Sequence, residues 1–499
     1  MSFTATLQQI LQITTGSCLV ASDLSEQVTG VSTDSRSIVT GNLFIAIRGD
    51  TTDGHLFLES VFAAQAAAVI VSNLWPGDEI TALLEKTKYR GAIIAVADTT
   101  VALGDLAKYW RSQIDCPVFA ITGSNGKTTT KEILRQLLSQ VVGAGTYSKK
   151  SLNNHWGLPL TLLGASRKDK FIVLEAGMNH PGELTYLSKI AEPTHLLMLN
   201  VAPAHIGHFA SLAEIAQAKA ELLAGLRQPG VVIYPSDDAN LITAIKAQAA
   251  SLKLTPRYVT YSSERSERAE IDQVDLKPER GFHAKNIKSK SFSGFEFEIL
   301  SDHGAGLPAS IPHLGRHNVK NALAAFSAAV TAFPDFKAEV FAQALSHSPQ
   351  PELRLAVREL PEGITLIEDC YNANPGSMRA ALSTLEDLAH GKSVAVVLGD
   401  MRELGDESSR FHEEIGKLAG SSQVIKRIVG IGVESKNLIL AAQLVGHTDA
   451  VWADGVRQAA EFVLSSPRPQ IILIKGSRGM ALEHVCKEIE KIIYALPSA

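Results

Sequence analysis

The stretch VFAITGSNGKTTTKEIL, residues 118–134, joins an apolar strand to a helix through a glycine-bearing turn. Gly123 and Gly126 let the backbone turn its N–H groups inward at the positive end of the helix, a favourable place for a phosphate group. Lys127 is placed to reach terminal phosphates, and the Thr128 hydroxyl is placed to ligate Mg²⁺. The stretch therefore predicts a nucleotide site at the end of a strand in a parallel α/β sheet.

This loop is shorter than the usual G-x-x-x-x-G-K-[ST] phosphate loop, because Ile121 stands where the first glycine would be. A glycine-rich turn with a surface lysine is the alternative interpretation. The strand, turn, lysine, hydroxyl and helix nevertheless follow one another in the order that a phosphate site requires. The residues expected to hold the phosphates are Gly123, Ser124, Asn125, Gly126, Lys127, Thr128 and Thr129.

Strand and helix patterns alternate along most of the 499 residues, which predicts an α/β fold with parallel sheets. Residues 1–99 are expected to form a small α/β domain. Residues 100–335 follow as the central phosphate-loop domain, in which the charged segment 255–312 ends in a β-ribbon. Residues 336–499 are expected to form a third, Rossmann-like doubly wound domain.

Charge and composition narrow the classes of partner. The formal net charge is -5 with mixed signs, so the chain has no basic stripe for nucleic acid and no polybasic tract for a membrane surface. No run of about 20 apolar residues predicts membrane insertion, and no secretory signal opens the sequence. Four widely spaced cysteines favour reduced thiols. We expect a cytoplasmic protein that binds small molecules.

Two further strand ends carry candidate ligands for the same site. Glu175 ends the strand FIVLEAG, where phosphate-loop proteins place an acidic residue near the magnesium ion. His205 and His208 follow the strand THLLMLN, at an edge where sheets of this class bind ligands. An ordinary strand-end glutamate and a structural loop histidine remain the alternatives.

The segment SLAEIAQAKAELL predicts a helix that begins with a capping box of Ser211 and Glu214. Lys219 falls in the middle of its apolar arc. A lysine there either extends its ammonium to the surface or has a charged partner, because an isolated buried ammonium is costly. A desolvated Lys219 could also react with CO₂ and become a carbamate anion that ligates a second Mg²⁺.

Motifs along nearly the whole chain resemble the Mur ligases of peptidoglycan synthesis. The motifs are TGSNGKTTTKE, SLNNHWGLPLTLL, LEAGMNHPGEL, NVAPAHIGHFASLAEIAQAKAEL, LGRHNVKNALAA and IEDCYNANPGSMRAAL. Within the family, the runs DSRSIVTGNLFIAIRGDTTDGHLF, YNANPGSM and LGDMRELG are similar to those of a member that adds D-alanyl-D-alanine.

The resemblance implies an activity. ATP would phosphorylate the terminal carboxylate of UDP-N-acetylmuramoyl-tripeptide, and the amine of D-alanyl-D-alanine would attack the acyl phosphate to form an amide. It also implies two Mg²⁺ ions, one held by Thr128 and Glu175 and the second by His205 and carbamylated Lys219. Lys127, His205 and Lys219 would form the catalytic centre of a cytoplasmic enzyme, expected to be a monomer.

The resemblance also implies roles for residues outside the loop. Those expected to contact ATP are Asn318, Arg354 and Asp369, with a helix cap as the alternative for Asn318. Those expected to contact the other substrates, with turns and polar loops as alternatives, are Asp34, Ser35, Arg36, Asn153, Asn154, Tyr371, Asn374 and Pro375. The first three would hold the uridine diphosphate on the first domain.

Two positions depart from the family pattern, and two other functions compete. Leu353 stands where a glycine usually precedes the arginine, and the bulky pair His155–Trp156 follows the two asparagines. A sister ligase that adds a diamino acid or D-glutamate, or that extends folate with glutamate, would share the central domain, but the D-N-P-R signature of the diamino-acid-adding sister is absent. A guanine-nucleotide switch should carry N-K-x-D, which is also absent.

Overall fold

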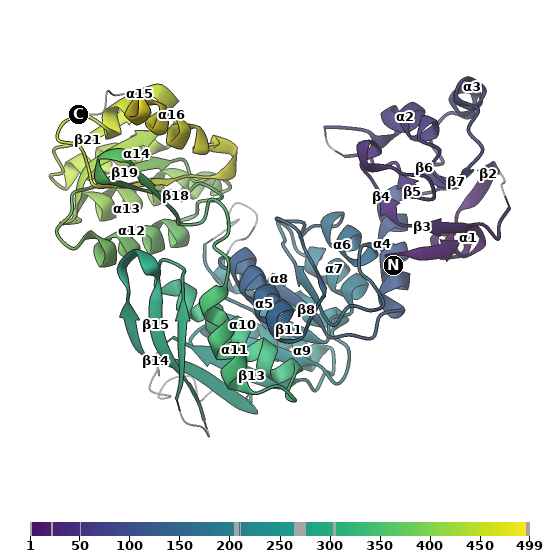
Figure 1. Cartoon of the computed structure of the whole chain (residues 1–499), viewed down its shortest axis with the longest axis horizontal. Helices are drawn as coiled ribbons and strands as arrows, with labels where there is room; N and C mark the ends of the chain where they lie inside the picture. The colour runs from purple at the N-terminus through teal and green to yellow at the C-terminus, as the bar shows by residue number, and fades with distance from the viewer. Residues whose placement is uncertain are drawn as a thin grey trace.

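The computed structural model describes residues 2–20, 23–49, 51–203, 209, 211–263, 276–302 and 306–495. It confirms the α/β fold with parallel sheets in a three-part architecture. In Figure 1 the purple N-terminal part and the yellow-green C-terminal part lie above opposite ends of the teal central part. The exact domain limits at residues 99 and 335 stay predictions.

The N-terminal part is built on a five-stranded sheet of order β2-β7-β6-β5-β4, with β1 and β3 paired separately. All neighbouring strands of the five-stranded sheet are parallel except the β2–β7 pair. The strands are β1 (Thr4–Thr6), β2 (Ser17–Val20), β3 (Gln27–Thr29), β4 (Val31–Ser32), β5 (Leu43–Ile45), β6 (Ala68–Ser72) and β7 (Ala92–Val96), and the helices are α1 (Leu7–Thr14), α2 (Leu58–Ala63) and α3 (Gly77–Thr87).

The central part contains a sheet of order β16-β15-β14-β13-β12-β11-β8-β10-β9. The seven neighbouring strands from β14 to β9 in this order run parallel, and β14, β15 and β16 form the expected antiparallel ribbon. The strands are β8 (Val118–Thr122), β9 (Thr146–Tyr147), β10 (Ile172–Glu175), β11 (His195–Met198), β12 (Val231–Pro235), β13 (Arg257–Ser262), β14 (Arg280–Ser289), β15 (Phe295–Ser301) and β16 (Leu307–Ile311). The helices are α4 (Thr99–Ser112), α5 (Lys127–Val141), α6 (Gly157–Leu163), α7 (Glu183–Ala191), α8 (Leu212–Ala220), α9 (Ala239–Ser251), α10 (His317–Ala332) and α11 (Ala338–Ala344).

The strand β8 shows why an apolar run of five residues forms the centre of this sheet. Val118 and Ala120 face one buried cluster, whereas Phe119 and Ile121 face the other, because alternate side chains of a strand point to opposite faces. Strands β10 and β11 flank β8 in parallel, with Glu175 paired to Ile121 and Met198 to Thr122. The ends of these three strands therefore lie together at one sheet edge.

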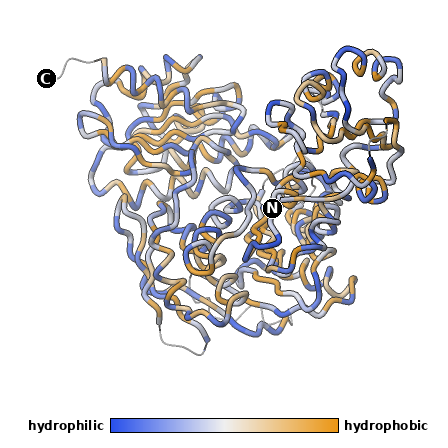
Figure 2. The backbone as a smooth tube through the Cα atoms, turned by 45° about the vertical axis from the view of Figure 1, so that its right-hand side comes forward, coloured by the Kyte–Doolittle hydropathy of each residue, from blue (hydrophilic) through white to orange (hydrophobic). Residues whose placement is uncertain are grey.

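The C-terminal part is a second layered sheet of order β17-β18-β22-β19-β20-β21, parallel except at the edge strand β17. Its strands are β17 (Ala356–Leu360), β18 (Ile364–Asp369), β19 (Val394–Gly399), β20 (Ile425–Ile431), β21 (Ala450–Ala453) and β22 (Ile471–Lys475). Its helices are α12 (Pro375–Ala389), α13 (Ser408–Gly420), α14 (Ser435–Leu444), α15 (Val456–Val463) and α16 (Glu483–Tyr494). Figure 2 shows these strands as orange, hydrophobic tubes between helices of mixed colour.

Helix α4 connects the first two parts. The Phe3 ring packs edge-on against Trp110 of α4, with 5.6 Å between ring centroids, and the Phe3 N–H donates to the Leu163 carbonyl. The four cysteines are free thiols, as the sequence predicts. None of the helices in the described part of the chain combines the length and the apolar character that a membrane crossing requires.

Candidate active site

The phosphate loop lies between β8 and α5, and its backbone conformation depends on glycine. Gly126 has a φ of 86°, and a Cβ atom there would lie 2.5 Å from the Asn321 Oδ1. Asn200, which follows β11, holds the loop from the side. Its Oδ1 accepts from the Asn125 N–H at 2.9 Å, and its Nδ2 donates to the Asn125 carbonyl at 3.0 Å. The loop therefore keeps its shape without a ligand.

Lys127 is folded back onto this loop. Its Nζ donates to the Gly123 carbonyl at 2.6 Å. Burial and the nearby Arg354 lower the pKa of Lys127, while the carboxylate of Glu175 acts in the opposite direction. The ammonium is thus already positioned above the loop where a phosphate would bind.

Glu175 ends β10 and has an exposed fraction of 2%. Its Oε1 accepts from the Asn153 Nδ2 at 3.0 Å, whereas its Oε2 is buried without a hydrogen-bond partner. The nearest cation to that oxygen is the Lys131 Nζ, at 3.7 Å, which is fully buried and donates to the Lys150 carbonyl. A buried carboxylate oxygen of this kind is suited to a metal ion.

Lys219 lies on α8, which begins after Ser211, whose hydroxyl accepts from the Glu214 N–H. Its side chain is 3% exposed, so it does not extend to the surface. Burial and the charge of Lys127 move the pKa of Lys219 well below its usual value, and Asp238 opposes the shift. The charged form of Lys219 is therefore destabilised relative to that of an exposed lysine.

His205, the other predicted metal ligand, lies outside the described residues, as does His208. Elsewhere in the described ranges, no group of three histidine, cysteine, aspartate or glutamate side chains is placed to hold a metal ion. Of the predicted metal ligands, Thr128, Glu175 and Lys219 line one cavity in the described ranges.

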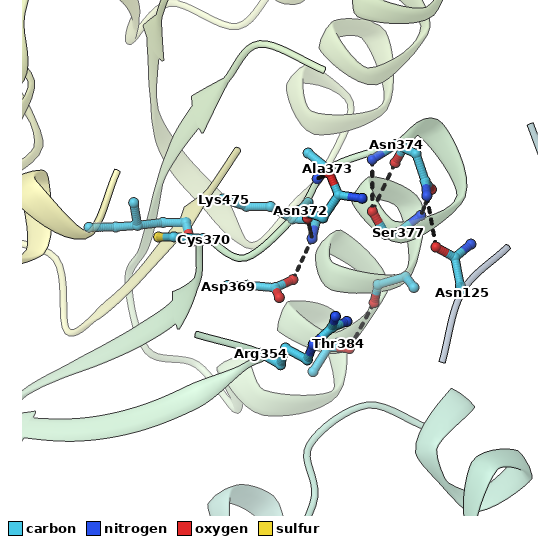
Figure 3. Close-up of polar contacts among 12 residues, drawn as sticks. Asn125, Arg354, Asp369, Cys370, Asn372, Ala373, Asn374, Ser377, Thr384 and Lys475 are labelled. Carbon is cyan, nitrogen blue, oxygen red and sulfur yellow. Dashed lines mark hydrogen bonds and ion pairs between the residues drawn. The ribbon is translucent and has the colours of Figure 1, made fainter. Parts of the chain in front are cut away.

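The C-terminal part contacts the phosphate loop directly. The Arg354 Nη2 donates to the Thr128 Oγ1 at 3.0 Å, and its guanidinium lies over the Tyr371 ring at 4.3 Å. The Asn374 Nδ2 donates to the Asn125 Oδ1 at 2.8 Å (Figure 3). These contacts join residues of two sheets across the site.

Asp369 and Asn374 are themselves held in place by their own domain. The Lys475 Nζ, at the end of β22, donates to the Asp369 Oδ2 at 2.6 Å and to the Asn372 carbonyl at 3.1 Å (Figure 3). Asn374 is the N-cap of α12, and Pro375 is the first residue of that helix. Asn374 thus has a structural role in addition to its contact with the loop.

Asn318 lies inside α10 and is not its cap. The N-cap of α10 is Arg316, so the cap interpretation of Asn318 is wrong. The Asn318 Nδ2 donates to the Leu314 carbonyl at 2.6 Å, and its Oδ1 accepts from the Asn321 Nδ2 at 2.8 Å. The side chain is therefore fixed beside the phosphate loop.

These groups lie around one cavity of about 1090 Å³. The predicted residues that line it are Gly123, Ser124, Asn125, Gly126, Lys127, Thr128, Thr129, Asn153, Asn154, Glu175, Lys219, Asn318, Arg354, Asp369, Tyr371 and Asn374. Pro375 is buried at the start of α12 and does not line the cavity.

Asp34, Ser35 and Arg36 lie apart from this cavity, in a short 3₁₀ turn on the surface of the N-terminal part. Asp34 pairs with Arg36 at 2.8 Å, and the hydrogen bonds from Arg36 lower the pKa of Asp34 to about 2. Their role in binding a uridine diphosphate stays a prediction.

The two departures from the family pattern have structural consequences. Leu353 adopts a φ of 57°, a region that favours glycine, and Leu355 has a φ of 51°, so Arg354 is held between two left-handed residues. The Trp156 Nε1 donates to the Thr100 Oγ1 of α4 at 3.2 Å. Trp156 also reaches the N-terminal part, because its ring lies 3.2 Å from where a Cβ on Gly49 would be.

Sequence reasoning missed Asn200, Asn321, Lys131 and Lys475. Lys475 gave the clearest signal, since a lysine that ends the apolar strand IILIK lies at the edge where parallel sheets bind ligands. Asn200 follows β11 directly, and an asparagine at that edge is a similar signal. Lys131 gave none, because a lysine in the first turns of a helix is usually exposed.

Comparison with known proteins matches each part of the chain to one family. The family models described as "Mur ligase family, catalytic domain", "Mur ligase middle domain" and "Mur ligase, glutamate ligase domain" match residues 27–111, 121–329 and 353–478. The UDP-N-acetylmuramoyl-tripeptide–D-alanyl-D-alanine ligase of Haemophilus influenzae is 32% identical over 97% of this chain and 97% of its own. The Bacillus subtilis protein of the same name is 33% identical over 92% of this chain and 93% of its own.

Solved structures agree over the full length. MurF from Acinetobacter baumannii aligns with a TM-score of 0.83 and 28% identity, covering 98% of this chain and 99% of its own. MurF from Thermotoga maritima in complex with ADP aligns with a TM-score of 0.74 and 21% identity, covering 94% of this chain and 98% of its own. A likeness at that identity supports the fold alone. The phosphate loop, the three-part architecture and these matches together show that the chain belongs to the Mur ligase family.

Proposed function

We propose that this chain is an ATP-dependent, ADP-forming ligase that joins D-alanyl-D-alanine to UDP-N-acetylmuramoyl-tripeptide through an amide bond. The observation that carries the proposal is the likeness, along almost the entire chain, to ligases of that name. The cavity supports it, because the phosphate loop and the C-terminal part face one another across a space large enough for a nucleotide and an amine substrate. The reaction would be the last cytoplasmic step in assembling the precursor peptide.

The residues of the chain divide the work. The backbone N–H groups of the loop and Lys127 would bind the terminal phosphates of ATP, once Lys127 leaves the Gly123 carbonyl. Asn318 and Asp369 would hold the adenosine, and Arg354 would contact the phosphates from the C-terminal part. The tripeptide carboxylate would then take the terminal phosphoryl group, and the resulting acyl phosphate would react with the dipeptide amine, releasing phosphate.

We propose that two Mg²⁺ ions bind in the site. Thr128 and the unpartnered Oε2 of Glu175 would hold one ion, and carbamylated Lys219 with His205 would hold the second. When bound, such ions reduce the repulsion between a triphosphate and an approaching carboxylate. A carbamate on Lys219 would also place a negative charge beside the ammonium of Lys127.

The other substrate contacts follow the same division. Asn153 and Asn154 would position the nucleotide sugar, with Asp34, Ser35 and Arg36 on the uridine diphosphate. Tyr371 and Asn374, which line the cavity as Pro375 does not, would lie beside the incoming dipeptide. We infer that the enzyme works as a cytoplasmic monomer.

Release of ADP and phosphate tests the proposal. The purified protein would be mixed with ATP, Mg²⁺ and UDP-N-acetylmuramoyl-tripeptide carrying either meso-diaminopimelate or lysine, with one amine acceptor at a time. We expect phosphate release with D-alanyl-D-alanine and none with D-glutamate, meso-diaminopimelate or free glutamate. Release that depends on one of those acceptors instead would assign the chain to a sister activity. Nucleotide binding with no amine-dependent release would reject the ligase function.

A further inference from the structure

The incoming dipeptide carries a carboxylate that the reaction does not consume. If the proposed function holds, its amine end reaches the phosphate site, and its carboxylate end lies farther out in the same cavity. An anion in a partly enclosed cavity needs a positive partner, because leaving it unpaired is costly. The cationic side chains that line the cavity in the described ranges are Lys127, Lys219, Lys320, Arg354, Lys475 and Arg478.

Most of these cations are already engaged. Lys127 and Lys219 belong to the phosphate and metal region described above. Lys320 is paired with Asp237 at 2.5 Å, and Lys475 is 2% exposed and bound to Asp369. Arg354 contacts Thr128 in the phosphate loop. None of these five is placed to hold a carboxylate at the outer end of the dipeptide.

Arg478 differs from the others in position and exposure. It begins the 3₁₀ turn Arg478–Met480, three residues after the end of β22. Its Nη1 donates to the Glu483 Oε1 at 2.6 Å, but 56% of its side chain remains exposed. Since a guanidinium has five N–H donors, this single bond leaves a forked pair free for a second carboxylate.

A second arginine contacts the turn that carries Arg478. Arg402 follows β19, and its N–H donates to the Ser477 Oγ at 2.9 Å, which links its loop to the residue before Arg478. The Arg402 Nη1 lies only 2.2 Å from where a Cβ on Gly479 would be. In the part of the chain that the structure describes, its side chain makes no ion pair. A side chain at position 479 would displace the Arg402 guanidinium from this turn.

We propose that Arg478 binds the terminal carboxylate of the incoming D-alanyl-D-alanine, and that Arg402, which contacts the same turn without lining the cavity, holds that turn in position. Arginine suits this role because its planar fork binds a carboxylate with two parallel hydrogen bonds. Lys475, at the end of β22 close to Arg478, ties the turn to Asp369 and Asn372 on the cavity wall. The subsite would thus fix the distance between the carboxylate and the reacting amine, which explains a preference for a dipeptide acceptor.

The experiment compares the natural dipeptide with D-alanyl-D-alaninamide, which lacks the charge. Steady-state rates would be measured for the wild type and for the variants Arg478→Met, Arg402→Met and Arg478→Lys. We expect Arg478→Met to raise the KM for D-alanyl-D-alanine by about 10- to 100-fold, with the KM for ATP unchanged. The amide should be a poor substrate for the wild type and no poorer for Arg478→Met. Arg478→Lys should recover part of the loss.

The matched control is Arg457→Met, since Arg457 is an ion-paired arginine of the same domain, 81% exposed, that does not line the cavity. It should leave all constants unchanged. Equal use of the acid and the amide by the wild type, or an Arg478→Met variant with an unaltered KM for the dipeptide, would overturn the subsite while leaving the ligase function in place. A wild type with no activity on either acceptor would instead count against the ligase function.

Discussion

The Arg354 Nη2 donates a hydrogen bond of 3.0 Å to the Thr128 Oγ1, although 226 positions separate the two residues. Thr128 belongs to the phosphate loop, and Arg354 belongs to the segment that leads into the C-terminal sheet. The hydroxyl proposed to ligate Mg²⁺ is therefore contacted by the C-terminal part. If Arg354 binds the phosphates as proposed, it would exchange this bond for contacts with ATP.

Replacing Arg354 by methionine tests this exchange. We expect kcat/KM for ATP to fall roughly 10- to 1,000-fold, because a charged donor to developing phosphate charge is lost. Binding of UDP-N-acetylmuramoyl-tripeptide alone should not change, which isothermal titration would measure. A variant with normal ATP kinetics would show that Arg354 contacts Thr128 only as a structural residue.

Lys219→Met is expected to lower kcat by about 100-fold or more, because the proposed carbamate would supply a metal ligand. Burial lowers the pKa of Lys219, so the neutral amine that reacts with CO₂ is more abundant near neutral pH than in an ordinary lysine. Carbamylation should therefore rise as the pH rises through that lowered pKa. A ¹³C NMR carbamate signal from labelled bicarbonate should appear in the wild type and be absent in Lys219→Met. Identical spectra would contradict the carbamate.

Comparing Asn374→Ala with Asn125→Ala separates the two roles of the Asn374 side chain, which are the hydrogen bond to the phosphate loop and the cap of α12. Both remove the hydrogen bond between the C-terminal part and the loop, but only Asn374→Ala removes the cap of α12. We expect Asn374→Ala to destabilise its domain by about 1 kcal/mol, lowering the Tm by about 2–4 °C. Asn125→Ala should leave the Tm unchanged, since the backbone of Asn125 keeps its bonds to Asn200. Equal Tm values for the two variants would show that the cap contributes nothing.

Acid should destabilise the protein through His195. Burial lowers the pKa of His195 to about 4 from the ordinary histidine value of 6.5, with a smaller contribution from Arg257. The unfolded chain therefore binds a proton that the folded chain excludes, and stability falls as the pH drops from 6.5 toward 4, by about 3 kcal/mol at most. Thermal unfolding between pH 7 and 5 should show a smaller decrease in Tm for His195→Phe than for the wild type.

The exposed His484 provides the control for that experiment. His484→Gln should follow the wild-type pH dependence of the Tm. His313 is also buried with a pKa lowered to about 4, so His195→Phe should reduce the acid sensitivity without abolishing it. If His195→Phe and the wild type lose stability equally, another group dominates the acid response.

Local features made much of the fold readable in the sequence. The phosphate loop could be placed because strand, glycines, lysine and helix are adjacent, and the structure begins α5 at Lys127. The β-ribbon was indicated by alternation in FEFEIL, which is β15. Lys219 could be selected because a lysine on an apolar helical arc is unusual, and the structure buries it.

The rest depended on contacts between distant segments. Asn200 supports the loop only because β11 lies beside β8, and no local pattern marks it. Asp34, Ser35 and Arg36 were identified by family resemblance, and their surface position apart from the cavity could not be read from the sequence. The sequence showed only that Leu353 stands where the family usually has a glycine. Its left-handed backbone conformation was established by the structure.

The sequence by itself determined the α/β architecture, the phosphate loop and the family, because each is written in periodicity or in motifs of adjacent residues. The tertiary structure decided which side chains meet across the cavity: Arg354 with Thr128, and Asn374 with Asn125. The physical reason is that these pairs form only when the strand ends of separate sheets face one another. Short-range propensities cannot specify that placement, which packing of the buried faces fixes.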